Sequence, residues 1–196
     1  MSEPHNSPAT AEFLFRRRRN RQLLIAIAVL FLGSFLIAGL LRLSGWRPDQ
    51  LRNRGELLNP YADLRNAAPV LADGRIYRWT PSARLWRIVV APPPDCAIAC
   101  VVLADELDTV WRLFGRHADQ VHLLWIGPPP AAAKRNAATQ VLRASPALRA
   151  QLPRVDDPRG VPVYVIDPNG FVILRYAPGF NPADLRSDVA RLLKLR

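Results

Sequence analysis

Residues 85–100 read LWRIVVAPPPDCAIAC and contain the only two cysteines of the chain. An apolar run ends in three prolines, and a stretch with helical spacing begins at the cysteines. Cys96 and Cys100 therefore stand at a predicted strand-to-helix junction. Cysteines four residues apart at the start of a helix lie within bridging distance. The pair is the candidate functional site, and an inert structural disulfide is the competing interpretation.

The chain around this pair alternates between strand-like and helix-like patterns. Short runs rich in Val, Ile and Trp predict strands, and apolar residues at every third or fourth position predict helices. The expected strands are 75–79, 85–90, 121–126, 161–166 and 171–176, and the expected helices are 97–116, 131–142 and a last one capped by Asn181. This order predicts an α/β fold, a thioredoxin-like mixed sheet with flanking helices. The apolar stripes of these elements are expected to share one core, with Val89, Leu103, Leu107, Leu124, Val163, Val165, Val172 and Val189.

A long apolar segment precedes this domain. Residues 23–41 read LLIAIAVLFLGSFLIAGLL without a charged side chain, close to the roughly 20 apolar residues that a membrane-spanning helix needs. A signal peptide has a shorter apolar core of about 7–15 residues, followed by a small-residue cleavage site. No such site follows this segment, so we expect an uncleaved single-pass anchor.

The charges that flank the anchor predict its orientation. Arginines crowd the N-terminal flank at positions 16–19 and 21, whereas those beyond the anchor are sparser and mixed with acidic residues. The positive-inside rule therefore favours a cytoplasmic N-terminus. In a bacterial inner membrane the C-terminal domain would then be periplasmic, where a cysteine pair can oxidise. The expected organisation is a cytoplasmic basic segment at 1–22, the anchor at 23–41, a stalk and lead-in at 42–72, and the thioredoxin-like domain at 73–196.

The formal net charge of +11 does not indicate nucleic-acid binding. All basic residues except Lys134 and Lys194 are arginines, and no dense cluster of them follows residue 21. Aromatic residues are not interleaved with a basic stripe, as a nucleic-acid interface would require. We therefore expect a solvated basic surface that meets the membrane and no nucleic acid.

The anchor, the Cys-x-x-x-Cys pair and the late segment VYVIDPNG at 163–170 together resemble the Sco/SenC/PrrC family of copper-insertion proteins, used in cytochrome c oxidase assembly. The resemblance implies that Cys96 and Cys100 match the family's two thiolate copper ligands. The family places its third ligand, a histidine, shortly before the late strand, where this chain has Arg159 or Gly160. Pro162 stands where thioredoxin-like folds often place a cis proline that faces the thiols.

The histidines of this chain do not supply the missing ligand. His5 precedes the anchor, and His117 and His122 are remote in sequence from the expected ligand position. Two thiolates alone suit Cu(I), whereas Cu(II) prefers imidazole ligands. Cys96, at the start of a helix, is the expected attacking thiol, and Cys100 the resolving thiol.

Two classes of function fit these patterns. The first is a membrane-tethered factor for cytochrome c oxidase copper-centre assembly, acting by thiol–disulfide exchange or by transient Cu(I) handling. It would be a thiol–disulfide oxidoreductase if exchange is its activity, with an oxidase subunit or another assembly factor as partner. The second is a non-enzymatic interaction or scaffold module that has kept the thioredoxin-like fold and lost its redox and copper chemistry.

Overall fold

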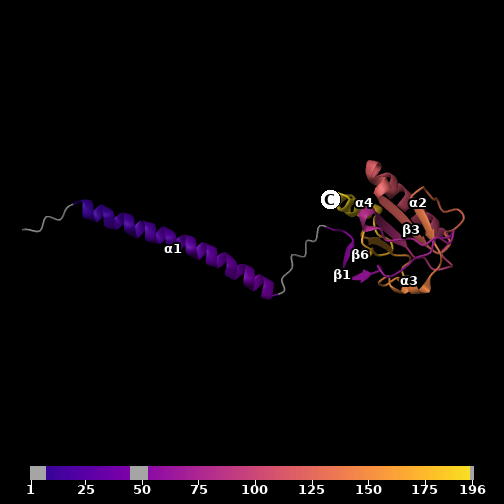
Figure 1. Ribbon diagram of the computed structural model, residues 1–196, viewed down its shortest axis with the longest axis horizontal. Helices are drawn as coiled ribbons and strands as arrows, with labels where there is room; N and C mark the ends of the chain where they lie inside the picture. The colour runs from indigo at the N-terminus through magenta and orange to yellow at the C-terminus, as the bar shows by residue number, and fades with distance from the viewer. Residues whose placement is uncertain (1–7, 45–52, 195–196) are drawn as a thin grey trace, which may run out of the picture. The chain divides into compact units, whose positions relative to one another are not determined.

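The computed structural model describes residues 8–44 and 53–194. Parts of three expected segments lie outside these residues: 1–7 of the cytoplasmic segment, 45–52 of the stalk, and 195–196 of the domain. The chain falls into two compact units that divide between Leu51 and Arg52. The first unit contains one long helix, α1 (Pro8–Leu43; Figure 1).

Helix α1 carries the expected anchor. Asn20–Leu43 is long and apolar enough to cross a membrane. Its large apolar side chains are exposed, with Leu30 at 74% and Phe35 at 70%. Water-soluble proteins rarely expose apolar surface on this scale. In a lipid bilayer, by contrast, a helix makes all its backbone hydrogen bonds internally, and its apolar side chains contact the acyl chains. The length and the exposure of α1 therefore suit a lipid environment.

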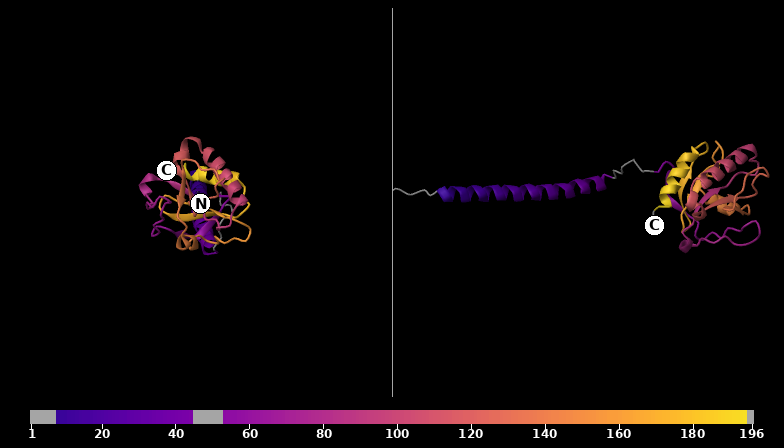
Figure 2. Two further views of the ribbon diagram at one scale, coloured as in Figure 1. Left: turned by 90° about the vertical axis from the view of Figure 1, so that its right-hand side faces the viewer. Right: turned by 90° about the horizontal axis from the view of Figure 1, so that it is seen from above.

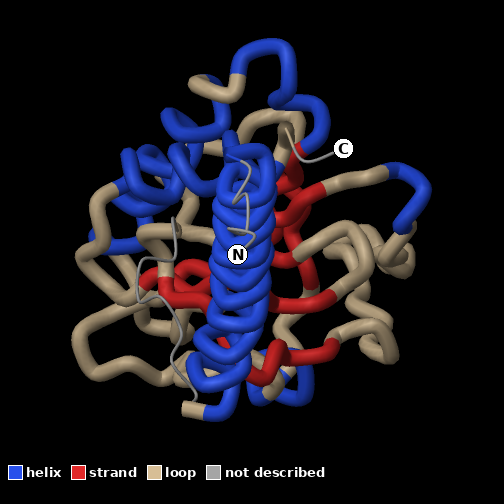
Figure 3. Tube along the Cα trace, turned by 90° about the vertical axis from the view of Figure 1, so that its left-hand side faces the viewer, coloured by secondary structure: helices blue, strands red, loops and turns tan. Residues whose placement is uncertain are grey.

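The second unit is built on one mixed sheet, drawn in red in Figure 3. Its strands are β1 (Glu56–Asp63), β2 (Trp86–Val90), β3 (Val121–Ile126), β4 (Thr139–Leu142), β5 (Val163–Ile166) and β6 (Phe171–Tyr176). They lie in the order β1-β6-β5-β2-β3-β4. Strands β2, β3 and β4 run parallel, and the other pairs are antiparallel. The carboxyl ends of the three parallel strands therefore meet at one edge of the sheet, where the cysteine segment leaves β2.

Helices cover the sheet on both faces. They are α2 (Ile98–Arg112), α3 (Pro146–Ala150) and α4 (Pro182–Leu192), with short 3-10 turns at Pro81–Ala83 and Gly115–Gln120. Helices α2 and α4 lie side by side in Figures 1 and 2. As the sequence predicts, Asn181 caps α4 by accepting a hydrogen bond from the Ala183 backbone N–H at 3.0 Å.

The sheet separates two hydrophobic cores, which corrects the expectation of one shared core. Leu103, Leu107, Val163, Val165 and Val189 pack on the face that α2 and α4 cover. The second core lies on the face that α3 and the long loops cover, and it contains Val89, Leu124 and Val172. Successive strand residues point to opposite faces, so the buried strands contribute to both cores.

The observed elements confirm most of the predicted order and correct it at three places. Residues 75–79 form no strand beyond an isolated bridge between Val70 and Ile76. The expected helix at 131–142 is wrong, because its last four residues form edge strand β4. Strand β1, which the sequence did not predict, pairs with β6. Strand β1 therefore places residues 56–63, within the segment expected to be the stalk and lead-in, in the sheet.

Candidate redox site

A disulfide bond joins Cys96 and Cys100 between β2 and α2. The two Cα atoms are 5.7 Å apart, inside the usual range of about 4.4–6.8 Å. Ala97 is the N-cap of α2, so Cys96 precedes the helix and Cys100 lies in its first turn. Cys100 is fully buried, whereas Cys96 is only partly buried. A thiol of another protein can therefore reach the Cys96 sulfur more readily than the Cys100 sulfur.

The prolines before the pair explain why the chain turns here. Proline lacks a backbone N–H and cannot extend a strand ladder, so Pro92, Pro93 and Pro94 end β2. The Cys96 backbone N–H then donates to the Pro93 carbonyl at 3.2 Å, which closes a turn. Helix α2 starts two residues later. The prolines therefore place Cys96 at the edge of the sheet, just before α2, with Cys100 in the first turn of the helix.

Two cavities flank the disulfide-bearing segment. One, of about 340 Å³, is lined by the three prolines, by Ile126 and by Arg149, at the carboxyl ends of the parallel strands. The other, of about 310 Å³, lies between the first turns of α2 and a wall formed by Arg159, Gly160 and the Pro178–Phe180 loop. Between the two cysteines, Ile98 is 80% exposed. The accessible sulfur therefore lies in a surface with apolar side chains, and two arginines, Arg149 and Arg159, line the cavities beside it.

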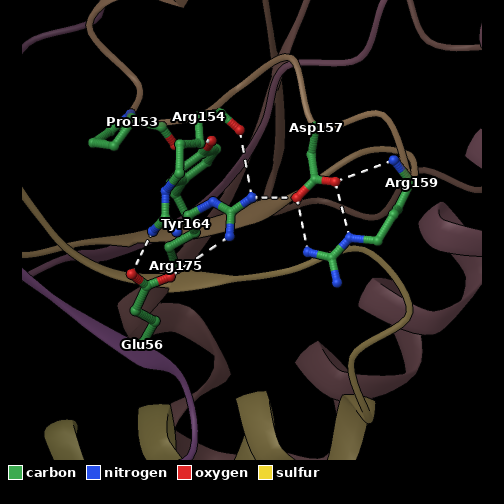
Figure 4. Close-up of polar contacts among 7 residues, drawn as sticks. All are labelled: Glu56, Pro153, Arg154, Asp157, Arg159, Tyr164 and Arg175. Atoms are coloured by element: carbon green, nitrogen blue, oxygen red, sulfur yellow. Dashed lines mark hydrogen bonds and ion pairs between the residues drawn. The ribbon is translucent and has the colours of Figure 1, made fainter.

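Arg159 is held in place by a carboxylate and not by the sulfurs (Figure 4). Its Nε and Nη2 donate to the two oxygens of Asp157 at 3.1 and 3.0 Å, and its backbone N–H donates to the same carboxylate. The Arg159 side chain is 66% exposed and lines the cavity on α2. It makes no hydrogen bond to either cysteine. An arginine fixed in this way contributes positive charge near the site, and it cannot ligate a metal.

Arg175 of β6 supports Asp157 from the interior. Its Nη2 donates to Asp157 at 2.6 Å, and its Nη1 lies 3.6 Å from Glu56 of β1. The Arg175 side chain is only 2% exposed. Hydrogen bonds from Arg159 and then from Arg175 hold the pKa of Asp157 well below its usual value. Asp157 therefore stays ionised and orients Arg159 toward the cavity.

Sequence reasoning missed both Asp157 and Arg175. The available signal was a charged residue inside the apolar run FVILRY at 171–176. A buried arginine needs a partner, and an acidic residue close to Arg159 supplies it. Nothing in the sequence showed which of the neighbouring acidic residues would do so.

Pro162 is buried at the entry to β5, but its peptide bond is trans. Among the described residues the one cis peptide bond is Asn59–Pro60, in β1. The expectation of a cis proline at Pro162 is therefore wrong. Gly160 at φ +136° and the Val161 that follows form part of the cavity wall instead.

His117 and His122 lie away from the disulfide. His122 of β3 bonds to the Tyr77 hydroxyl through Nδ1 at 2.9 Å, and the Nε2 of His117 accepts from Arg116. His5 lies outside the described residues. Within the described part of the chain, no group of three or more His, Cys, Asp or Glu side chains is placed to hold a metal ion. The donor set at the site is thus two sulfurs, with an arginine where a third ligand was expected.

Comparison with known proteins identifies the family. Residues 86–196 match the family described as transmembrane-like, thioredoxin-like, C-terminal domain. The chain belongs to this family. The matched region runs from β2 to the C-terminus and so contains the cysteine pair, Arg159 and Pro162. Together with the apolar helix α1, this supports a single-pass membrane protein.

Solved structures confirm the thioredoxin-like fold of this family member. Yeast Sco1 with copper bound is 14% identical, with a TM-score of 0.52, and the match covers 66% of this chain and 90% of that protein. BsSco, a member of the Sco family of cytochrome c oxidase assembly proteins, is 12% identical with a TM-score of 0.51. Its match covers 72% of this chain and 98% of BsSco. No curated protein sequence matches the chain.

Proposed function

We propose that this protein is a membrane-tethered periplasmic factor that assists copper-centre assembly in cytochrome c oxidase by thiol–disulfide exchange through Cys96 and Cys100. The observation that carries the proposal is the disulfide itself, with one partly exposed and one buried sulfur at the strand-to-helix junction. The similarity to yeast Sco1 and BsSco supports the choice of client. Its partner would be an oxidase subunit or another assembly factor at the bacterial inner membrane.

The exchange reaction assigns a different role to each cysteine. In the reduced protein, the Cys96 thiolate attacks a client disulfide, forms a mixed disulfide and releases one client thiolate. The Cys100 thiolate then attacks the Cys96 sulfur, and the second client thiolate leaves. The client disulfide has gained two electrons, and Cys96 and Cys100 form the bond seen here. A reduced dithiol carrier must return two electrons before the next cycle.

Copper fits this site only as a transient cargo. Once reduced, the two thiolates could hold Cu(I), because soft sulfur ligands suit that ion. Arg159 stands at the expected position of a third ligand, and a guanidinium cannot coordinate a cation. We therefore expect at most two sulfur ligands to Cu(I) and poor binding of Cu(II).

Replacement of both cysteines by serine tests the proposal. We expect loss of oxidase activity at normal abundance of the variant protein, because the exchange needs both sulfurs. Ala99→Ser is the matched control, since it adds the same hydroxyl group to the same turn of α2 and leaves both cysteines in place. Full oxidase activity in the double cysteine variant would instead support a scaffold that has lost its chemistry.

Copper stoichiometry of the purified, reduced protein separates exchange from metal transfer. Little Cu(II) binding, with any bound Cu(I) lost on replacement of either cysteine, agrees with the proposal. Tight stoichiometric Cu(II) binding would contradict it, since that requires ligands other than the two sulfurs.

A further inference from the structure

The start of α2 lacks the capping contacts that helix N-termini commonly have. Its N-cap residue, Ala97, has no side-chain oxygen, and φ −101° and ψ −98° place it outside the extended region that N-cap residues usually adopt. The first intrahelical hydrogen bond runs from the Val101 N–H to the Ala97 carbonyl, at 3.3 Å. The three preceding backbone N–H groups, of Ile98, Ala99 and Cys100, donate to no group in the described part of the chain.

The disulfide explains why α2 begins so late. In a regular α-helix, residues four apart have their Cβ atoms about 5–6 Å apart. A disulfide needs them about 3.5–4.5 Å apart. Cys96 and Cys100 therefore cannot be bonded while both lie in one regular helical turn. Accordingly, α2 begins at Ile98, and the bonded Cys96 stays outside the helix.

A better N-cap residue stands directly before Cys96. Asp95 is exposed, and its side chain makes no hydrogen bond or ion pair within residues 8–44 and 53–194. Aspartate is among the strongest N-cap residues, and alanine is among the weakest. In a helix that began at Cys96, the Asp95 carboxylate would accept from the Ile98 N–H. The Asp95 and Cys96 carbonyls would accept from the next two N–H groups, so all three donors would gain an acceptor.

We propose that Asp95 is a positioning residue of the redox site, which caps α2 when the cysteine pair is reduced. Loss of the disulfide lets α2 extend by two residues, so that Cys96 becomes its first residue. There the helix N-terminus favours the Cys96 thiolate. The cap stabilises the dithiol and not the disulfide, because the Asp95 side chain has no protein contact in the oxidised form. Asp95 therefore makes the disulfide easier to reduce.

In the exchange reaction, such a cap helps to return the pair to its reduced, attacking form after each cycle. This use of the cap rests on the proposed function. The extension of α2 itself does not, since it follows from the geometry of the cysteine pair and can be measured without a client.

Redox equilibrium with glutathione tests the role of Asp95. The reduced full-length protein in detergent is equilibrated with oxidised glutathione, and each disulfide formed in the protein releases two molecules of reduced glutathione. The variants are Asp95→Ala, which cannot cap, and Asp95→Asn, which keeps a capping oxygen and loses the same charge. We expect the equilibrium constant for oxidation to be about fivefold higher in Asp95→Ala than in Asp95→Asn. Equal constants overturn the inference, since Asp95 would then act through its charge or not at all.

Amide hydrogen exchange tests the extension of α2 directly. On reduction, exchange at Ile98, Ala99 and Cys100 should slow in the wild type and in Asp95→Asn, and much less in Asp95→Ala. Unchanged exchange in the reduced wild type overturns the inference and leaves the thiol–disulfide exchange in place. Slowed exchange in a protein whose cysteines are dispensable for oxidase activity would support the inference and contradict the proposed function.

Discussion

At the scale of single residues, His122 links the stability of the domain to pH. Arg87 donates to the Tyr77 hydroxyl at 3.0 Å, and that hydroxyl can then donate to the His122 Nδ1 at 2.9 Å. This arrangement needs a neutral imidazole. Burial, and then the charge of Arg87, lower the pKa of His122.

A lowered histidine pKa destabilises the folded state in mild acid. Between the folded pKa and the unfolded value of about 6.5, the unfolded chain binds more protons, so stability falls as pH drops through this window. His122→Gln keeps a hydrogen-bond acceptor and removes the titration. Urea unfolding at pH 7 and pH 5 should therefore show a smaller loss of stability in this variant than in the wild type. Equal losses in both would contradict the assignment.

Asp188 of α4 binds the segment that precedes β1 through hydrogen bonds. Its Oδ2 accepts hydrogen bonds from the Arg54 and Gly55 backbone N–H groups and from the Tyr176 hydroxyl, at 2.7, 2.9 and 2.8 Å. Asp188→Ala leaves three donors without their acceptor. We expect it to reduce the free energy of unfolding by about 3 kcal/mol. Tyr176→Phe removes one of the three hydrogen bonds and should reduce the free energy of unfolding by about 1 kcal/mol. Urea unfolding measures both variants. Equal losses in the two would show that the hydrogen bonds from the Arg54 and Gly55 backbone contribute little.

The sequence predicts the residues of the candidate site better than the residues that hold them in place. Cys96 and Cys100 are recognisable because the pair stands alone at a strand-to-helix junction. Arg159 was found by its position before the late strand. The ion pairs that hold Arg159, from Asp157 and through it Arg175, were not predictable. Which of several acidic residues pairs with these arginines depends on how β6 packs against the loop that contains Asp157.

At the scale of elements, strong periodicity predicted what the structure shows. Strands β2, β3, β5 and β6 are apolar runs bounded by turns, and α2 and α4 carry one continuous stripe. Strand β1 escaped prediction because Pro60 and polar residues interrupt its pattern, and only pairing with β6 makes it a strand. Strand β4 was mistaken for a helix because its segment is rich in alanine. Its strand form depends on pairing with β3, a tertiary contact that local propensity does not contain.

The two faces of α2 should respond differently to truncation. Leu107 is 3% exposed in the core, and Leu113, the C-cap residue of α2, is 54% exposed. Leu107→Ala should destabilise the domain by about 2–4 kcal/mol, because it removes buried methyl groups and leaves a cavity. Leu113→Ala should cost less than about 1 kcal/mol. Thermal or urea unfolding distinguishes them, and equal costs would contradict the assigned orientation of α2.

At the scale of the whole molecule, the arginine cluster before the anchor predicts the orientation of the protein. We expect the C-terminal domain on the periplasmic side, because dense positive charge near a span stays cytoplasmic. A C-terminal fusion to a reporter that is active only in the periplasm should therefore be active. Activity of a C-terminal reporter that works only in the cytoplasm would contradict this orientation and would leave the cysteines in a reducing compartment.

The central claim is that Cys96 attacks client disulfides and that Cys100 resolves them. The most direct measurement is a trapping experiment in cells with Cys100→Ser, which keeps the partly exposed sulfur and removes the buried one. Non-reducing electrophoresis should show mixed disulfides with client proteins, and they should disappear when Cys96 is also replaced by serine. The absence of any adduct from Cys100→Ser at normal abundance, with a wild-type pair that stays fully oxidised, would contradict the claim.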